Sequence, residues 1–251
     1  MKDAKAEPAG EKAGERIAKR LARAGVCSRR DAEKLIAEGR VIVDGKKLDT
    51  PAFKVKAGAR ISVDGKPVKA AERTRLWRYH KPKGLMTTHH DEKDRETVFE
   101  KLPASMPRVI SVGRLDYNSE GLLLLTNDGE LARRLELPAN GWLRRYRVRV
   151  FGKLMQSDLD RLQKGVVIEG VNYGPVEATM ERQQGGNAWA TIALKEGKNR
   201  EVRKLMEHVG VKVNRLIRVS FGPFHLGLLK EGQVDEVLAK VMREQLGTMK
   251  S

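Results

Sequence analysis

The chain opens with two short amphipathic helices. Apolar residues recur every three or four positions across residues 15–24, which predicts a helix that buries one face and ends at Gly25. Ser28 and Asp31 have the spacing of a helix N-cap with a capping box, and they predict a second helix that runs to Gly39. The two helices are therefore expected to meet at a short turn.

Two β-rich runs follow at residues 41–45 and 61–65, and each ends in an Asp-Gly pair. Asp-Gly favours the tight turn of a β-hairpin, so each run should begin a hairpin and the first module should close near Val68. Residues 1–14 have balanced charge and no apolar period, which predicts a disordered leader, and the polar residues 70–75 predict a linker.

Beyond the linker, short β-like runs alternate with helical patterns, an order typical of an α+β domain with helices packed on a mainly antiparallel or mixed sheet. We expect a small module at residues 15–69, a larger domain at 76–237 and a helical tail at 238–251. The expected strands are 76–84, 109–112, 122–126, 146–151, 189–194 and 216–219, and the expected helices are 130–135, 157–162, 199–209 and a terminal helix at 234–250.

The charge indicates a polyanionic partner. Lysine and arginine number 50 against 33 aspartates and glutamates, a formal net charge of +17, which favours binding to phosphate backbones. An anionic membrane would also attract this charge, but no apolar run is long enough to span a bilayer and the N-terminus does not resemble a signal peptide. We therefore expect a cytoplasmic protein without a membrane partner. Cys27, the single cysteine, excludes an internal disulfide and is interpreted as a small core residue.

Basic side chains lie in and just after the second expected helix. The segment RLARAGVCSRRDAEKLIAEGRVIVDGKKL resembles the S4-type RNA-binding domain, which implies RNA contact by Arg29, Arg30, Lys34 and Arg40. The alternative interpretation is a solvated helix face without a partner. A DNA-binding helix-turn-helix is the other alternative, although it lacks the appended hairpins.

One carboxylate lies where a scaffold could support a reactive group. Asp116 is in the segment 113–121, between an apolar strand and Leu122–Leu125, which should be almost wholly buried. Irregular backbone between rigid core strands exposes a side chain and fixes its position. An aspartate on such a loop can equally be a turn residue, with Arg114 as an ordinary surface partner.

The amino-acid sequence of this segment is specific for one family. GRLDYNSEGLLLLTNDG (residues 113–129) resembles the catalytic motif of the ribosomal pseudouridine synthases of type A (small ribosomal subunit) and of types B, E and F (large ribosomal subunit). Three other segments agree with the family in the right order: HKPKG (80–84), RYRV (145–148) and GKNREVRKL (197–205). The sequence is most similar to type B. His80 is a departure, because the family commonly has Asn or Tyr there.

The resemblance implies a reaction and a partner. The family converts uridine in RNA to its C-glycoside isomer without a metal or other cofactor, and type B implies ribosomal RNA, 23S rRNA in particular, and a monomer. By resemblance, Asp116 is the catalytic carboxylate, either as a nucleophile on the sugar or as the base that begins a glycal route. A non-catalytic factor that binds ribosomal RNA during ribosome assembly is the alternative function.

The resemblance also assigns roles to neighbouring residues. Arg203 would be the charge partner of Asp116, on a helix that we expect Asn199 to cap, and Tyr146 would stack on the target base. Without the family, a basic helix face and a core tyrosine would explain these two residues. Arg114 would hold phosphate or the flipped nucleotide, and further contacts with RNA are expected from Lys198, Arg200 and Lys204.

A metal site is not expected. His89, His90 and Asp91 are adjacent, but neighbouring side chains on a strand point to opposite faces and no further histidine or cysteine is placed nearby.

Overall fold

The chain divides into two compact units, Met1–Arg73 and Thr74–Ser251. The computed structural model describes residues 14–247. The division falls within residues 70–75, where the sequence predicts a linker. Residues 1–13 of the expected leader and 248–251 of the expected tail lie outside the described residues.

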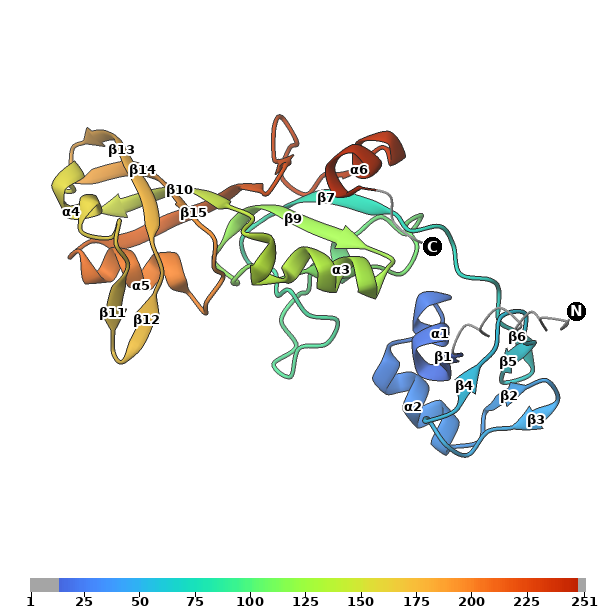
Figure 1. The fold of residues 1–251 in the computed structure, drawn as a ribbon. Coiled ribbons are helices and arrows are strands. Elements are labelled where there is room, and N and C mark those ends of the chain that lie inside the picture. Colours follow the sequence, from blue (N-terminus) through green and yellow to red (C-terminus); the bar gives the residue numbers. More distant parts are fainter. Residues whose placement is uncertain (1–13, 248–251) are drawn as a thin grey trace, which may run out of the picture. The chain divides into compact units, whose positions relative to one another are not determined.

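The first unit packs two helices against short strands (Figure 1). Its core consists of side chains from both helices and from some of the strands, including Ile17, Leu21 and Ile36, which are fully buried. The Oγ of Ser28 accepts a hydrogen bond from the N–H of Asp31 at 3.1 Å, which confirms the predicted N-cap. The elements are β1 (Glu15–Arg16), α1 (Ile17–Arg23), α2 (Arg29–Ala37), β2 (Val41–Val43), β3 (Lys46–Lys47), β4 (Lys54–Val55), β5 (Ile61–Val63) and β6 (Lys66–Pro67).

Both predicted hairpins are present. β2 pairs with β3 and β5 with β6, and the two hairpins join through β2 and β5 into one four-stranded sheet. Asp44 and Asp64, like the glycines that follow them, have positive φ, the backbone that a two-residue hairpin turn requires. The expected start of the first helix at Glu15 is wrong, because Glu15 and Arg16 pair with β4 and the helix begins at Ile17.

The second unit is built on a nine-stranded mixed sheet, which confirms the predicted α+β class. Its main path runs β13-β14-β10-β15-β9-β7-β17, with β16 paired to β15 and β8 to β9, and all pairs are antiparallel except β9 with β15. The strands are β7 (Leu76–Lys81), β8 (Ile110–Val112), β9 (Glu120–Thr126), β10 (Arg144–Phe151), β13 (Val176–Gln184), β14 (Asn187–Leu194), β15 (Lys212–Phe221), β16 (Phe224–His225) and β17 (Val234–Glu236), beside a separate hairpin of β11 (Val166–Ile168) and β12 (Val171–Tyr173).

A hydrophobic cluster covers each face of this sheet. The leucines of β9 are all fully buried, as predicted, and they alternate: Leu123 and Leu125 enter one cluster, Leu122 and Leu124 the other. The first cluster includes side chains of α4 (Gln156–Asp160) and α5 (Glu201–His208), and the second includes side chains of α3 (Gly129–Glu136) and α6 (Ala239–Leu246). Short 3₁₀ helices lie at Phe99–Lys101 and Pro138–Asn140. In Figure 1, β15 runs alongside β10, with α5 beside them.

The C-terminal prediction is partly wrong. Val234–Glu236 forms β17, which pairs with β7 at the sheet edge, so the helix is confined to α6. Met242 and Leu246 of α6 are buried in the second cluster, so α6 is packed on the larger unit.

Helix α5 begins later than predicted. Arg200 occupies the N-cap position in left-handed backbone with φ 51°, and no side chain caps the helix. The expected cap by Asn199 is therefore wrong. The carboxylate of Glu201 instead accepts the N–H of Lys198 at 2.8 Å, which closes the turn ahead of the helix.

Candidate active site

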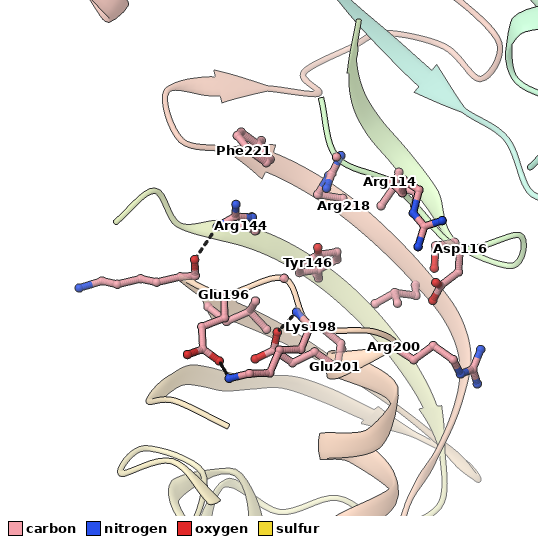
Figure 2. A pocket seen from close by; sticks show the side chains of 18 of the residues that line it. Arg114, Asp116, Arg144, Tyr146, Glu196, Lys198, Arg200, Glu201, Arg218 and Phe221 are labelled. Atoms are coloured by element: carbon pink, nitrogen blue, oxygen red, sulfur yellow. Dashed lines mark hydrogen bonds and ion pairs between the residues drawn. The ribbon is translucent and has the colours of Figure 1, made fainter. Parts of the chain in front are cut away.

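A pocket of about 300 Å³ lies in the larger unit (Figure 2). Five segments form it: the loop between β8 and β9, residues 136–138 at the end of α3, the start of β10, the second half of β15, and residues 194–202 that lead into α5. The charged and aromatic side chains that line it are Arg114, Asp116, Glu136, Arg144, Tyr146, Lys195, Glu196, Lys198, Arg200, Glu201, Arg218 and Phe221.

A buried lysine holds the loop that carries Asp116. Lys81, at the end of β7, is fully buried, and its ammonium points at a ring of backbone carbonyls. The Nζ donates to the carbonyl oxygens of Pro82 at 2.9 Å, Ser119 at 2.9 Å, Asp116 at 3.2 Å and Tyr117 at 3.5 Å. An ammonium has three donors, so these carbonyls share them, and the loop backbone from Asp116 to Ser119 is tied to one charge.

Burial has a second effect on Lys81. It lowers the pKa of the ammonium to about 8, although the nearby carboxylates of Asp116 and Glu120 favour the charged form. Glu120 is itself 3% exposed and accepts from Arg215 at 2.8 Å.

Other contacts hold the same loop from three directions. The Oγ1 of Thr87 donates to the carbonyl of Leu115 at 2.8 Å, and the N–H of Gly84 donates to that of Tyr117 at 2.9 Å. The N–H of Gly113 donates to Glu136 of α3 at 2.7 Å. The Asp116 side chain is thus displayed on backbone that is fixed at several points, as a preorganised catalytic group requires.

Arg203 of α5 lies next to Asp116. Its Nε is 4.0 Å from a carboxylate oxygen of Asp116, whose side chain is one-third exposed. One terminal nitrogen donates to the carbonyl of Asn118 at 2.9 Å, and the other to that of Val213 at 3.3 Å. The Nε is buried without a hydrogen-bond partner. Burial lowers the pKa of Arg203 and Arg200 adds to this, while Asp116 opposes it. Arg203 therefore supplies positive charge beside a carboxylate that solvent reaches.

Tyr146 lies on the pocket side of β10. Tyr146, Val148 and Val150 are buried on one face of the strand, whereas the arginines between them are half-buried on the other, as the alternation predicts. Tyr146 is 9% exposed, and Figure 2 shows it between Arg144 and Asp116. The ring of Tyr146 therefore packs in the hydrophobic core and also forms part of the pocket wall.

The pocket brings together most of the residues that the resemblance marks in the larger unit, although Arg203 does not line it. Arg114, Lys198 and Arg200 are exposed and line it together with Asp116 and Tyr146. Lys198 also donates to Glu196 and to the carbonyl of Asn172. Lys204 is half-buried on α5 and does not line the pocket.

The four basic residues of the first unit differ in their surroundings. Arg29, Arg30 and Lys34 are exposed on α2. Arg40 is also exposed, but its guanidinium makes two hydrogen bonds of 2.7 Å to Asp64 and one of 2.9 Å to Glu38. Arg40 therefore already has acidic partners within its own unit.

Arg144, Arg218 and Phe221 are among the pocket groups that sequence reasoning did not find. A signal for the arginines exists in the strand period, because Arg144 is in phase with the buried Tyr146 on β10, and Arg218 with the buried Leu216 on β15. A basic residue in the buried phase of a strand needs a partner or a ligand.

Within residues 14–247, no group of three or more His, Cys, Asp or Glu side chains could hold a metal ion. His89 stacks on Phe99 with ring centroids 3.6 Å apart. None of the helices described is long and apolar enough to cross a membrane.

Comparison with known proteins gives two family matches. The model of the RNA pseudouridylate synthase family matches residues 75–208, and that of the S4 domain matches residues 15–61. An RNA pseudouridine synthase of Rickettsia felis is 48% identical over 227 residues, which is 89% of this chain and 97% of that protein.

Two relatives have names that state a substrate. The ribosomal large subunit pseudouridine synthase B of Salmonella typhimurium is 44% identical over 88% of this chain and 78% of its own, and that of Pasteurella multocida is 46% identical over 82% and 61%. A crystal structure described as a pseudouridylate synthase has the same fold, with a TM-score of 0.63 at 23% identity over 92% of this chain and 99% of that one.

Proposed function

The chain belongs to the RNA pseudouridylate synthase family, and from this premise we propose that it isomerises a uridine of large-subunit ribosomal RNA, with Asp116 as the catalytic carboxylate. The choice of the large ribosomal subunit is supported by the relatives in Salmonella and Pasteurella that carry that name. The placement of Asp116 carries the proposal: its side chain lines a pocket, beside Arg203 and on a loop whose carbonyls Lys81 holds.

The reaction needs a single carboxylate at the sugar. As the C1′–N1 bond breaks, positive character builds at C1′, and an ionised Asp116 can stabilise it, capture C1′ as an ester, or remove the 2′ hydrogen. Arg203 places its positive charge 4.0 Å from the carboxylate of Asp116. Tyr146 offers a ring face on which the uracil stacks after the uridine leaves its helix.

The remaining parts of the proposal follow from the same chemistry. Isomerisation adds and removes no atom and needs no net oxidant or reductant, and the resemblance to the family implies that the proposed enzyme acts without a metal or other cofactor. The basic residues at the pocket, Arg114, Lys198 and Arg200, would contact backbone phosphates, while Lys204 and the S4 residues would extend the RNA contact. We propose that it acts as a monomer in the cytoplasm, where ribosomal RNA is its substrate.

Replacement of Asp116 tests the proposal. With 23S rRNA transcripts or immature large-subunit particles labelled with tritium at C5 of uridine, the natural protein should release tritium. Asp116→Asn should lower the rate by more than about 10³-fold, because it removes the group that acts on the sugar. The variant should fold and bind RNA normally, since the side chain is one-third exposed and has only the distant contact with Arg203.

Asp94→Asn, an exposed loop carboxylate of the same unit, is the matched control and should keep full activity. If the natural protein releases no tritium from any ribosomal substrate, the chain is a non-catalytic RNA-binding factor. If Asp116→Asn is as active as the natural protein, the catalytic assignment is wrong.

A further inference from the structure

Two arginines are buried in the wall of the pocket. Arg218 is 3% exposed and Arg144 is 8% exposed. Their hydrogen bonds go to backbone carbonyls: Arg218 donates from Nε to Leu122 at 2.7 Å, and Arg144 donates from one terminal nitrogen to Trp142 and Lys195. Neither forms an ion pair with a carboxylate in the part of the chain that the structure describes.

The two guanidinium groups also lie close to each other. Their central carbons are 4.7 Å (Arg144) and 5.3 Å (Arg218) from the centroid of the same ring, that of Phe221. Burial lowers the pKa of Arg144, and the charge of Arg218 lowers it further. The pocket wall thus carries two like charges on an apolar support, without a counter-charge in contact.

One nitrogen of this pair lacks a hydrogen-bond acceptor. The Nη2 of Arg218 is inaccessible to solvent and has no hydrogen-bond partner. A buried cationic donor without a partner is costly, and a negatively charged acceptor would recover that free energy. The geometry therefore calls for an anionic ligand, or for one that becomes anionic during the reaction.

The position of Arg218 identifies that ligand. Arg218 of β15 is the register partner of Tyr146 on β10, and both side chains line the pocket. Cross-strand partners have Cβ atoms about 5 Å apart, so a base stacked on Tyr146 lies within reach of the guanidinium. Figure 2 shows Arg218 between Phe221 and Arg114.

We propose that Arg218 binds the uracil of the target nucleotide and stabilises the negative charge that this base carries once its bond to the sugar has broken. This inference rests on the proposed function. When the C1′–N1 bond breaks, its electron pair leaves with N1, and the charge spreads onto the ring oxygens, which accept from Arg218. C1′ is meanwhile captured by Asp116 as an ester, or Asp116 takes the hydrogen from C2′ and leaves a glycal. After the ring turns, C5 forms the new bond to C1′ as the ester bond to Asp116 breaks or, on the glycal route, as the proton returns to C2′. C5 then loses its proton and N1 gains one, so no atom is added or lost overall.

A base fits this position better than a phosphate does. A phosphodiester belongs to a continuous, hydrated chain, and the exposed Arg114, Lys198 and Arg200 suit it. The buried Arg218 is reached by a small planar group, and a low dielectric strengthens its interaction with a charge that develops there. Arg144, already bound to two carbonyls, acts as a positioning residue that raises the local positive potential.

The test compares two leaving groups in one enzyme preparation. The substrate is a 23S rRNA fragment whose isomerised uridine has been mapped with the natural protein, made with uridine or with 5-fluorouridine. Fluorine withdraws electrons and stabilises the uracil anion by itself. Single-turnover rates of consumption of the original nucleoside are measured by nuclease digestion and chromatography, beside the RNA dissociation constant at several salt concentrations.

Arg218→Gln should lower the single-turnover rate on uridine by about 10²-fold, the size expected when one preorganised donor to a developing charge is lost. On 5-fluorouridine the loss should shrink to about tenfold or less, since that anion needs less stabilisation. Arg218→Lys, which keeps the charge, should be less impaired on uridine than Arg218→Gln. Because the two RNAs are compared with one preparation, a partly folded variant does not alter the ratio. Arg149→Gln, on the other face of β10, should leave both rates unchanged.

An equal loss of rate on both RNAs would overturn the proposal. So would an unchanged rate at saturating RNA combined with weaker binding and a smaller salt dependence, which would assign Arg218 to a phosphate. If the natural protein converts neither nucleoside, the proposed function itself fails. If the natural protein and Arg218→Gln both convert uridine at the normal rate, the proposed function stands and only the role of Arg218 is wrong.

Discussion

At the scale of single residues, the pocket depends on buried positive charges that contact backbone. Lys81 contacts the carbonyls around Asp116, Arg203 contacts Asn118 and Val213, and Arg218 contacts Leu122. Each charge is thereby bound to segments distant in sequence. Because carbonyls solvate a buried cation without neutralising it, these side chains hold the loop and keep the pocket electropositive.

Lys81 should make stability depend on pH in the alkaline range. Its pKa is about 8 in the folded protein and 10.5 ordinarily. Below pH 8 the amine is charged in both states, so its burial cost is constant. Between pH 8 and 10.5 the unfolded chain binds a proton that the folded protein lacks, so the free energy of unfolding should rise with pH, by about 3 kcal/mol relative to Lys81→Met.

Urea unfolding of both proteins across this range measures the difference. Lys93→Met, which removes an exposed lysine of the same unit, is the control and should show no such rise relative to the natural protein. A difference between the natural protein and Lys81→Met that does not change with pH would show that the pKa of Lys81 is not lowered.

At the scale of elements, the parallel contact between β9 and β15 sets the geometry of the pocket. Gly121 of β9 is the register partner of Arg218 on β15, directly after the loop of Asp116. Its φ is 101°, and a Cβ at this position would lie 2.3 Å from the carbonyl oxygen of Arg218. Only glycine permits this approach, which joins the Asp116 loop to the strand that carries Arg218.

Gly121→Ala should therefore destabilise the protein much more than an ordinary glycine replacement. Gly170→Ala is the matched control, since Gly170 also has positive φ, 77°, but nothing lies within 4 Å of an added Cβ. We expect a cost of about 1–2 kcal/mol for Gly170→Ala from backbone strain alone, and at least about 3 kcal/mol for Gly121→Ala, where overpacking adds to it. Equal midpoints of thermal unfolding would contradict the close contact.

At the scale of the whole molecule, two units share a strong positive charge and one polyanionic substrate. The charge of +17 supports RNA affinity that is independent of sequence, while in the proposed function the pocket residues act on one nucleotide. The first unit exposes Arg29 and Arg30 on α2, where they can contact RNA but are not part of the pocket that holds Asp116.

Replacing both Arg29 and Arg30 by Gln should weaken RNA binding and make it less sensitive to salt. If both contact phosphates, the slope of log K against log salt should fall in magnitude by about 1.4–1.8, while the single-turnover rate at saturating RNA stays unchanged. Lys240→Gln, an exposed lysine on α6, is the control. An unaltered slope would mean that these arginines form a solvated helix face.

The sequence by itself determined the local features, because their causes lie within a few residues. Asp-Gly pairs specify hairpins through the backbone that they tolerate, and the run Leu122–Leu125 is too apolar to lie anywhere but in the core. The segment that carries Asp116 was recognisable because its residues are contiguous. Even the burial of Arg144 and Arg218 could have been predicted, because each is in phase with buried side chains of its strand, β10 or β15.

Tertiary structure decided what those residues contact. The carbonyl partners of Lys81 are up to 38 residues away, and Arg203 lies 85 residues from Asn118, so no local pattern records either contact. Long-range pairing also turned Val234–Glu236 into a strand at the sheet edge. A sheet joins distant segments by backbone hydrogen bonds that every sequence can make, and therefore only the folded chain shows which charges share a pocket.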